Sequence, residues 1–135
     1  MQWLINLVAE RVIATIGIPP VYIDRGDPAA VDYTDATLTR NAAWHELDLS
    51  AIVPAGAKAV SLNLKFRSNL VSLEGWFRKN GNANTAAIAG VETAVAGVNV
   101  YGDLTVALDS DRKINYLFGA GGLDVISLTI KGWWL

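Results

Sequence analysis

The side chains that could do chemistry in this chain are few, and the first is a solitary histidine, His45. General-base catalysis, catalytic triads and zinc sites mostly rest on histidine, and zinc sites need several nitrogen or sulfur ligands. The chain contains no cysteine, which removes thiol catalysis, thiolate metal sites and disulfide bonds. Because His45 alternates with Leu47 and Leu49, we expect a half-buried structural histidine rather than a catalytic one.

Carboxylates are the next candidates, because a glycosidase needs only two of them. Four lie in ordinary strand or loop contexts, with no motif to pair them: Glu46, Asp48, Glu74 and Glu92. A second acidic group lacks the alternating spacing of an EF-hand loop and is expected in a solvated linker: Asp24, Asp27, Asp32 and Asp35. The glycine-rich run 119–122 is not followed by a Lys-Ser/Thr helix start, so it does not predict a phosphate loop. The sequence therefore predicts no enzyme, no metal site and no cofactor.

Aromatic side chains on polar strand faces are a stronger signal. Trp76 shares its face with Glu74 and Arg78, Trp44 aligns with polar neighbours, and so does Tyr101. A large ring on a wet face costs solvation unless something covers it. The cover would be a neighbouring subunit, the N-terminal segment of the same chain, or a sugar ring. We therefore predict a set of partner or ligand contacts: Trp44, Trp76, Arg78 and Tyr101. Trp133 and Trp134 are adjacent in the last expected strand, so one of them must point away from the core.

The elements that position these residues follow from a polar–apolar alternation with a period of two. It is clearest at Val60, Leu62, Leu64 and Phe66, and the same pattern places Val71, Leu73 and Phe77 on one face, and Val98, Val100, Leu104 and Val106 on another. Turn residues separate the expected strands, which we place at 44–49, 58–67, 71–79, 85–90, 97–108, 112–118 and 123–134. This pattern predicts an all-β fold: an antiparallel two-sheet sandwich, jelly-roll-like.

The first 42 residues divide into two parts. Residues 1–18 are apolar with sparse polar interruptions. Three of these, Gln2, Asn6 and Glu10, would form one polar stripe on a helix, which favours that structure; a pair of β-branched strands is the alternative. We predict this segment to be an oligomerisation or anchoring device, with its interface residues at Trp3, Leu4, Ile5, Leu7, Val8, Val12 and Ile16. Residues 19–42, rich in proline and aspartate, are expected to form a connector in which 21–23 could add a short strand. The sandwich domain then occupies 43–135.

The bulk composition limits the partners. At 135 residues one domain with a real core is expected. Eleven basic against thirteen acidic residues give a net charge of −2, which does not favour nucleic acid. Residues 3–18 contain Glu10 and Arg11 in the middle of the apolar run, which disfavours both a signal peptide and a membrane span. The hydrophobic share of 52% favours partner chains that cover apolar surface.

Five stretches resemble a small β-sandwich domain of tailed-phage and prophage virion proteins. They are Trp44-His-Glu-Leu-Asp-Leu-Ser50, Val53-Pro-Ala-Gly-Ala-Lys-Ala-Val60, Phe77-Arg-Lys-Asn-Gly81, Asp109-Ser-Asp-Arg-Lys-Ile114 and Ile130-Lys-Gly-Trp-Trp134. The resemblance covers residues 43–135 and brings no catalytic residues with it. It implies a virion component, of decoration, tail-fibre or spike type, that is commonly oligomeric.

The sequence thus favours a non-enzymatic phage structural protein, located in the virion, that acts through homo-oligomeric assembly and contacts with other virion proteins. The alternative is a lectin-like, carbohydrate-binding module that uses its surface aromatics to stack on a glycan. A hydrolase is the weakest of the three interpretations.

Overall fold

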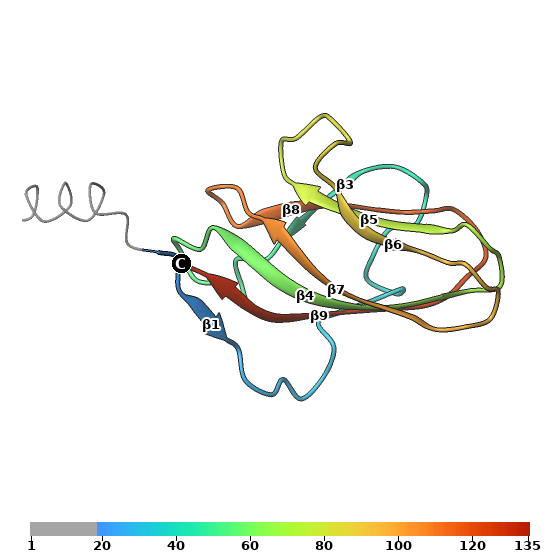
Figure 1. Ribbon diagram of the computed structural model, residues 1–135, viewed down its shortest axis with the longest axis horizontal. Helices are drawn as coiled ribbons and strands as arrows, with labels where there is room; N and C mark the ends of the chain where they lie inside the picture. Colours follow the sequence, from blue (N-terminus) through green and yellow to red (C-terminus); the bar gives the residue numbers. More distant parts are fainter. Residues whose placement is uncertain (1–18) are drawn as a thin grey trace, which may run out of the picture.

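The structure of the protein is a computed structural model that describes residues 19–135, and the side chains of residues 123 and 124 are left aside. Its strands run along the sequence in this order: β1 (Tyr22–Asp24), β2 (Tyr33–Thr34), β3 (His45–Asp48), β4 (Ala59–Ser68), β5 (Glu74–Lys79), β6 (Ala89–Glu92), β7 (Val100–Ala107), β8 (Lys113–Phe118) and β9 (Leu123–Trp134). They form two layers, with the C-terminus and the start of the described chain at the same end (Figure 1).

The strand order identifies the sandwich as a jelly roll. One sheet has the order β1-β9-β4-β7, with β2 also paired to β9, and the other has the order β3-β8-β5-β6. Every pairing is antiparallel. Pairs β5/β6, β4/β7, β3/β8 and β1/β9 are nested in the sequence, as in one long hairpin rolled up into two sheets. The all-β, two-sheet, jelly-roll prediction is confirmed.

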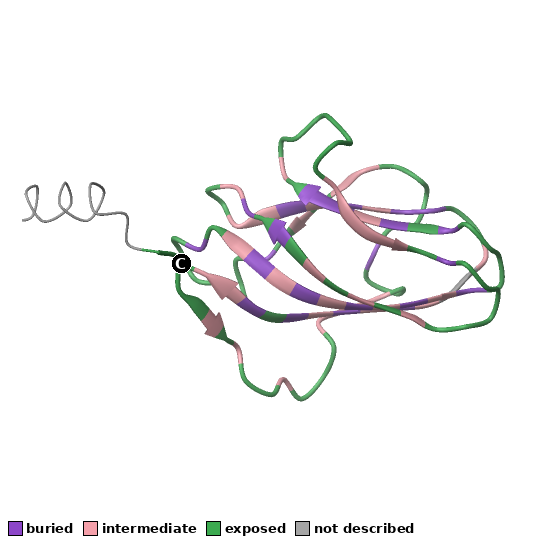
Figure 2. Ribbon diagram, in the orientation of Figure 1, coloured by how far each residue is buried: buried purple, intermediate pink, exposed green. Residues whose placement is uncertain are grey.

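The core lies between the sheets because the alternation holds along one strand of each sheet, β4 and β8. All ten residues of β4 alternate between intermediate and buried, and β8 repeats this pattern (Figure 2). Phe118 is fully buried, with its ring centroid 5.9 Å from that of Phe66 and 5.8 Å from those of Phe77 and Tyr116. Offset and edge-to-face rings at these distances attract one another beyond the area they bury. Phe118 is therefore the centre of an aromatic cluster that joins the two sheets.

Two residues expected in the core are exposed instead. Val71 is 58% exposed and Val98 is 51% exposed, because β5 begins only at Glu74 and β7 only at Val100. Ser72 has φ 57° and Gly97 has φ 74°, so both segments turn before the strands start. The polar–apolar alternation of the sequence continues into these loops, where it no longer indicates which side chains are buried. The strand expected at 85–90 is also displaced, and β6 spans Ala89–Glu92.

The connector was expected to be solvated, but residues 22–34 lie against β9, and Thr39 and Ala42 donate hydrogen bonds to Tyr116 and Phe118 of β8. Arg25 and Asp32 form an ion pair, with 2.8 Å between Nη2 and Oδ1. The backbone N–H of Ile130 donates to Asp32 Oδ2 (2.8 Å), and Arg25 Nη1 donates to the carbonyl of Ile130 (3.0 Å). The register of β9 against β4 shifts at this point, opposite Ser61 and Leu62. The ion pair therefore satisfies backbone groups that the bulge takes out of the ladder.

The predicted N-terminal interface, Trp3 to Ile16, lies outside the described residues. Within residues 19–135, no helix has the length and apolar character needed to cross a bilayer.

Candidate interaction surfaces

Trp44 and Arg78, both predicted as contact residues, meet on the outer face of the β3-β8-β5-β6 sheet. The guanidinium carbon of Arg78 lies 3.9 Å from the ring centroid of Trp44. Arg78 is only 9% exposed, so this is a desolvated cation–π contact, the stronger kind. One face of the Trp44 ring is therefore covered by the protein itself.

Arg78 also holds the β5–β6 loop. Its Nη1 donates to the carbonyl of Ala83 (3.1 Å) and, over a longer distance, to that of Asn84 (3.5 Å). Its Nε is buried without a hydrogen-bond partner among the described residues. A buried guanidinium that fixes two loop carbonyls and covers an indole acts as a structural clamp. Sequence reasoning placed Arg78 on a wet face, because alternation does not show that a loop folds back over it.

Trp76 lies in a cross-strand row on the same face. It pairs with Leu117 of β8 on one side and with Gly90 of β6 on the other. A Cβ on Gly90 would overlap both the Trp76 ring and the carbonyl oxygen of Gly75. The indole therefore lies across the backbone of Gly90, where no side chain larger than hydrogen fits. Trp76 and Leu117 are both half-buried.

A polar network flanks this row. The Asn80 amide donates to Glu46 Oε2 (3.1 Å) and to Asp109 Oδ2 (2.9 Å). Asn115 donates to Asn80 Oδ1 (2.8 Å), and Lys113 Nζ lies 2.6 Å from Glu46 Oε1. The network ties β3, β8, β5 and the β7–β8 turn together.

The ionisation of this network is unlike that of a catalytic pair. Glu46 raises the pKa of Lys113 through a hydrogen bond and its charge. Burial works to raise the pKa of Asp109, but hydrogen bonds from Asn80 and the backbone N–H groups of Lys113 and Asp111 outweigh it, so this pKa is lowered. Both shifts favour the charged forms, whereas general acid–base catalysis needs a pKa near the working pH.

His45 is half-buried, as predicted. Its Nε2 lies 2.7 Å from Asn41 Oδ1, and its ring centroid lies 5.6 Å from that of Tyr116. Residues 19–135 contain no group of three or more His, Cys, Asp or Glu side chains placed to hold a metal ion.

A third surface, which we call the tip, was not predicted from the sequence. It comprises the β4–β5, β6–β7 and β8–β9 loops and lies at the end of the sandwich opposite the C-terminus (Figure 1). Four large hydrophobic side chains are exposed to solvent there: Leu70 (49% exposed), Val71 (58%), Val95 (58%) and Val98 (51%). Tyr101, predicted as a contact, is 63% exposed at the start of β7 beside these loops, so it is on the other sheet from Trp44 and Trp76.

Two fully or almost fully buried hydroxyls fix the tip loops. Ser68 Oγ donates to the carbonyl of Gly122 (2.7 Å) and accepts from the N–H of Leu70 (2.9 Å). Thr93 Oγ1 donates to the carbonyl of Leu70 and accepts from the N–H of Leu73, both at 2.9 Å. Ser68 is 0% and Thr93 is 1% exposed. The apolar side chains of the tip are therefore held outward by an ordered backbone.

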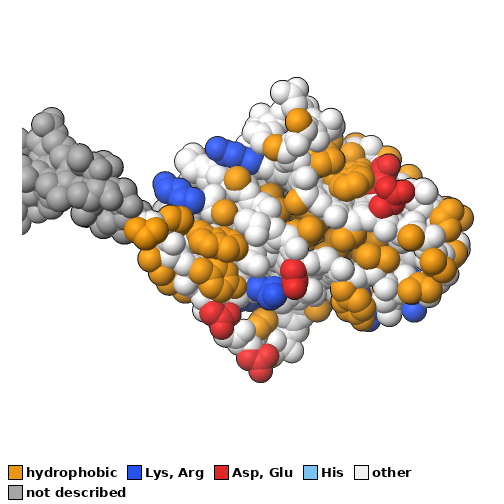
Figure 3. Space-filling model, viewed as in Figure 1, with side chains coloured by type: hydrophobic (Ala, Val, Ile, Leu, Met, Phe, Trp, Pro, Cys, Tyr) orange, Lys and Arg blue, Asp and Glu red, His pale blue; other side chains and the backbone are white. Residues whose placement is uncertain are grey.

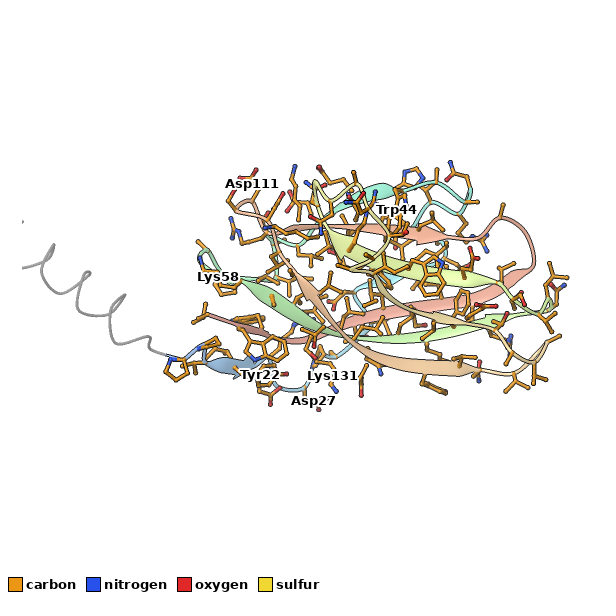
Figure 4. All side chains as sticks on the ribbon, turned by 45° about the horizontal axis from the view of Figure 1, so that its top comes forward. Tyr22, Asp27, Trp44, Lys58, Asp111 and Lys131 are labelled. Carbon is orange, nitrogen blue, oxygen red and sulfur yellow. The ribbon has the colours of Figure 1, made fainter. Side chains whose placement is uncertain are left out.

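The opposite end, which we call the terminal end, is also apolar. Val21 is 55%, Tyr22 42% and Leu135 46% exposed, and the backbones of Val21 and Leu135 are hydrogen-bonded to each other. Trp133 packs against the core, whereas Trp134 points outward with its ring 4.9 Å from that of Tyr22, so the prediction for the two tryptophans is confirmed. Figure 3 shows hydrophobic side chains at both ends of the visible face and also across its middle, and Figure 4 shows Tyr22 and Trp44 on different layers.

No protein-family model matches the chain, and no curated protein matches its sequence. Among solved structures, the coat protein of Tobacco streak virus is similar, with 13% sequence identity and a TM-score of 0.41 over 88% of this chain and 87% of that one. A likeness of this degree is no basis for assigning a function.

Proposed function

We propose that this chain is a non-enzymatic viral structural protein that works by assembling with copies of itself and with other proteins of the virion. A phage decoration, spike or tail-associated module is the specific form of this proposal. The observation that carries it is the pair of apolar ends: the tip and the terminal end both expose large hydrophobic side chains on an ordered backbone. Exposed, contiguous apolar surface is typical of protein–protein contacts.

Three further points support this role. Jelly rolls serve as capsid subunits, lectins and cupins, and of these roles assembly accounts best for apolar surface at both ends. The polar network around Asn80 is internally paired and holds strands together. The motifs that resemble phage virion domains lie within residues 43–135, the part that forms most of the sandwich.

Sedimentation velocity of the full chain between about 1 and 300 µM tests the proposal. We expect a concentration-dependent shift from monomer to oligomers, since interfaces of about 1,200–2,000 Å² support specific association. Negative-stain microscopy of the same samples should show discrete assemblies. A chain that stays monomeric throughout this range contradicts the proposal. Capsid, portal or tail genes next to the coding gene would support the virion location.

A carbohydrate-binding module is the second candidate, and one observation favours it: the Tyr101 ring is 63% exposed on an ordered strand. A glycan array separates the two functions. Binding that Tyr101→Ala or Trp76→Ala abolishes, in a chain that does not self-associate, would favour the lectin function.

A further inference from the structure

The tip needs an occupant that comes from another molecule. Its loops contribute about five exposed side chains: Leu70, Val71, Val95, Val98 and the adjoining Tyr101. At exposed fractions near one half, these leave on the order of 400 Å² of apolar area in water, comparable to the largest patch on a typical monomer. A stable interface buries about 800 Å² on each partner. The exposed apolar side chains of the tip therefore amount to about half of the area that each partner of a standard interface buries.

The loops of the tip also contain no charged side chains. Residues 94–102 read Ala-Val-Ala-Gly-Val-Asn-Val-Tyr-Gly, and residues 69–73 and 119–122 likewise contain no Asp, Glu, Lys or Arg. An uncharged patch selects an apolar partner, because a charged one would lose its hydration without gaining a counter-charge. The buried hydroxyls of Ser68 and Thr93 fix the loops in advance, which lowers the entropy that binding must offset.

The chain itself contains an apolar segment of the right character, residues 1–18. Its sequence leads directly into the terminal end, where Val21, Tyr22 and Leu135 are exposed. Its predicted interface includes Ile5, Val8 and Val12.

In the helix that its sequence favours, this segment is too short to reach the tip of its own molecule. Tyr22 pairs with Trp134 at one end of β9, and Ser68 pairs with Leu123 at the other. The twelve residues of β9 span about 40 Å at 3.3 Å per residue. Eighteen residues in the helix that their sequence predicts span about 27 Å. The segment therefore falls short of its own tip but can reach the tip of a neighbour placed end to end.

We infer that the protein assembles head to tail: the N-terminal segment and terminal end of one copy bind the tip of the next copy. This inference rests on the proposed self-assembly and specifies its interface. The contact is heterologous, since each copy contributes two different surfaces.

Two full-length variants test the inference. A tip variant carries Val71→Asp and Val95→Asp, and a segment variant carries Val8→Asp and Val12→Asp. Val31→Asp, at a residue 45% exposed in the β1–β2 connection, is the control for the tip. Asn6→Asp, on the expected polar stripe, is the control for the segment. Circular dichroism and melting temperature establish that each variant folds.

We expect each double variant to weaken self-association by about 10- to 100-fold and each control to leave it unchanged. The decisive sample is the 1:1 mixture. The tip variant keeps an intact segment and the segment variant keeps an intact tip, so the mixture should form a heterodimer that cannot grow. Light scattering would show twice the mass of the monomer.

Other outcomes overturn the inference in distinguishable ways. If the segment variant still assembles and the tip variant does not, the interface is tip to tip. If the tip variant still assembles, the segments bind one another. In both cases the proposed self-assembly stands and the head-to-tail contact is wrong. A full chain that is monomeric at every concentration overturns both the head-to-tail contact and the proposed self-assembly, whether or not it binds phosphatidylcholine vesicles.

Discussion

The clamp formed by Arg78 and Trp44 gives the sharpest prediction about stability. Arg78→Met removes the guanidinium but keeps an unbranched apolar stem beside Trp44. Two carbonyls, those of Ala83 and Asn84, then lose the donor that now lies 3.1 and 3.5 Å away. The substitution also removes a cation from a ring centroid 3.9 Å away.

The magnitude follows from three contributions. Hydrogen bonds from a charged donor stabilise by about 1.5–3 kcal/mol, and a desolvated cation–π contact by about 2 kcal/mol. The third contribution has the opposite sign. Arg78 is only 9% exposed and its Nε has no hydrogen-bond partner among the described residues, so the variant avoids a desolvation cost of several kcal/mol. We expect a net loss of about 2 kcal/mol in the free energy of unfolding for Arg78→Met.

A double-mutant cycle isolates the ring contact. Urea unfolding of the wild type, Arg78→Met, Trp44→Leu and the double variant should give a coupling free energy of about 1 kcal/mol. Lys79→Met is the matched control, because Lys79 is the exposed neighbour on the same strand, and it should change stability by less than about 0.5 kcal/mol. Arg78→Met should also speed cleavage within residues 81–87 by a nonspecific protease.

A coupling below about 0.3 kcal/mol would refute the reasoning, because it would mean that the guanidinium does not stabilise the indole. If Arg78→Met leaves cleavage of the β5–β6 loop unchanged, Arg78 does not anchor this loop through the carbonyls of Ala83 and Asn84.

Three further predictions concern the core, a close approach and the acid limit. Phe118→Ala should lower the free energy of unfolding by about 3–5 kcal/mol in urea, and Phe118→Leu by clearly less. Gly90→Ala should lower the melting temperature markedly, and Trp76→Ala in the same chain should restore only part of it, since the Gly75 carbonyl also blocks the new Cβ. Hydrogen bonds lower the pKa of Asp109 from its ordinary 3.8, so its contribution to stability is present above about pH 4 and is lost as the pH falls through the lower folded value. Asp109→Asn should therefore make the melting temperature less dependent on pH below about pH 4.

The jelly roll was predictable because strands of both sheets obey one rule. In β4 and β8 the side chains alternate strictly between the core and the surface, so a period of two reports burial directly. The same rule failed at Val71 and Val98. Those residues continue the sequence pattern, but the backbone turns at Ser72 and Gly97, and beyond a turn the period carries no information on which side faces the core.

For the predicted contact residues, too, the sequence showed some features and not others. Alternation correctly placed Trp44 and Trp76 on an outer face, because outward direction is a local property of a strand. It could not show that Arg78 covers Trp44, since that contact joins β5 to the residue that precedes β3, and β8 lies between these two strands. The tip depends on three loops brought together by the fold, and its only sequence signal is the uncharged run at 94–102.

The edges of the sandwich indicate why its ends are the surfaces available for assembly. β1 has three residues and β3 has four, with Glu46 and Asp48 among them, and short or charged edge strands resist pairing with another sheet. On the other side β6 and β7 approach closely: a Cβ on Gly102 would lie 2.6 Å from Val91 Cγ1, so the two sheets nearly close there. With its edges protected, the molecule exposes ordered apolar surface chiefly at its two ends. Because those ends differ, repeated contacts between them yield a ring if the rotation between copies closes and a filament if it does not.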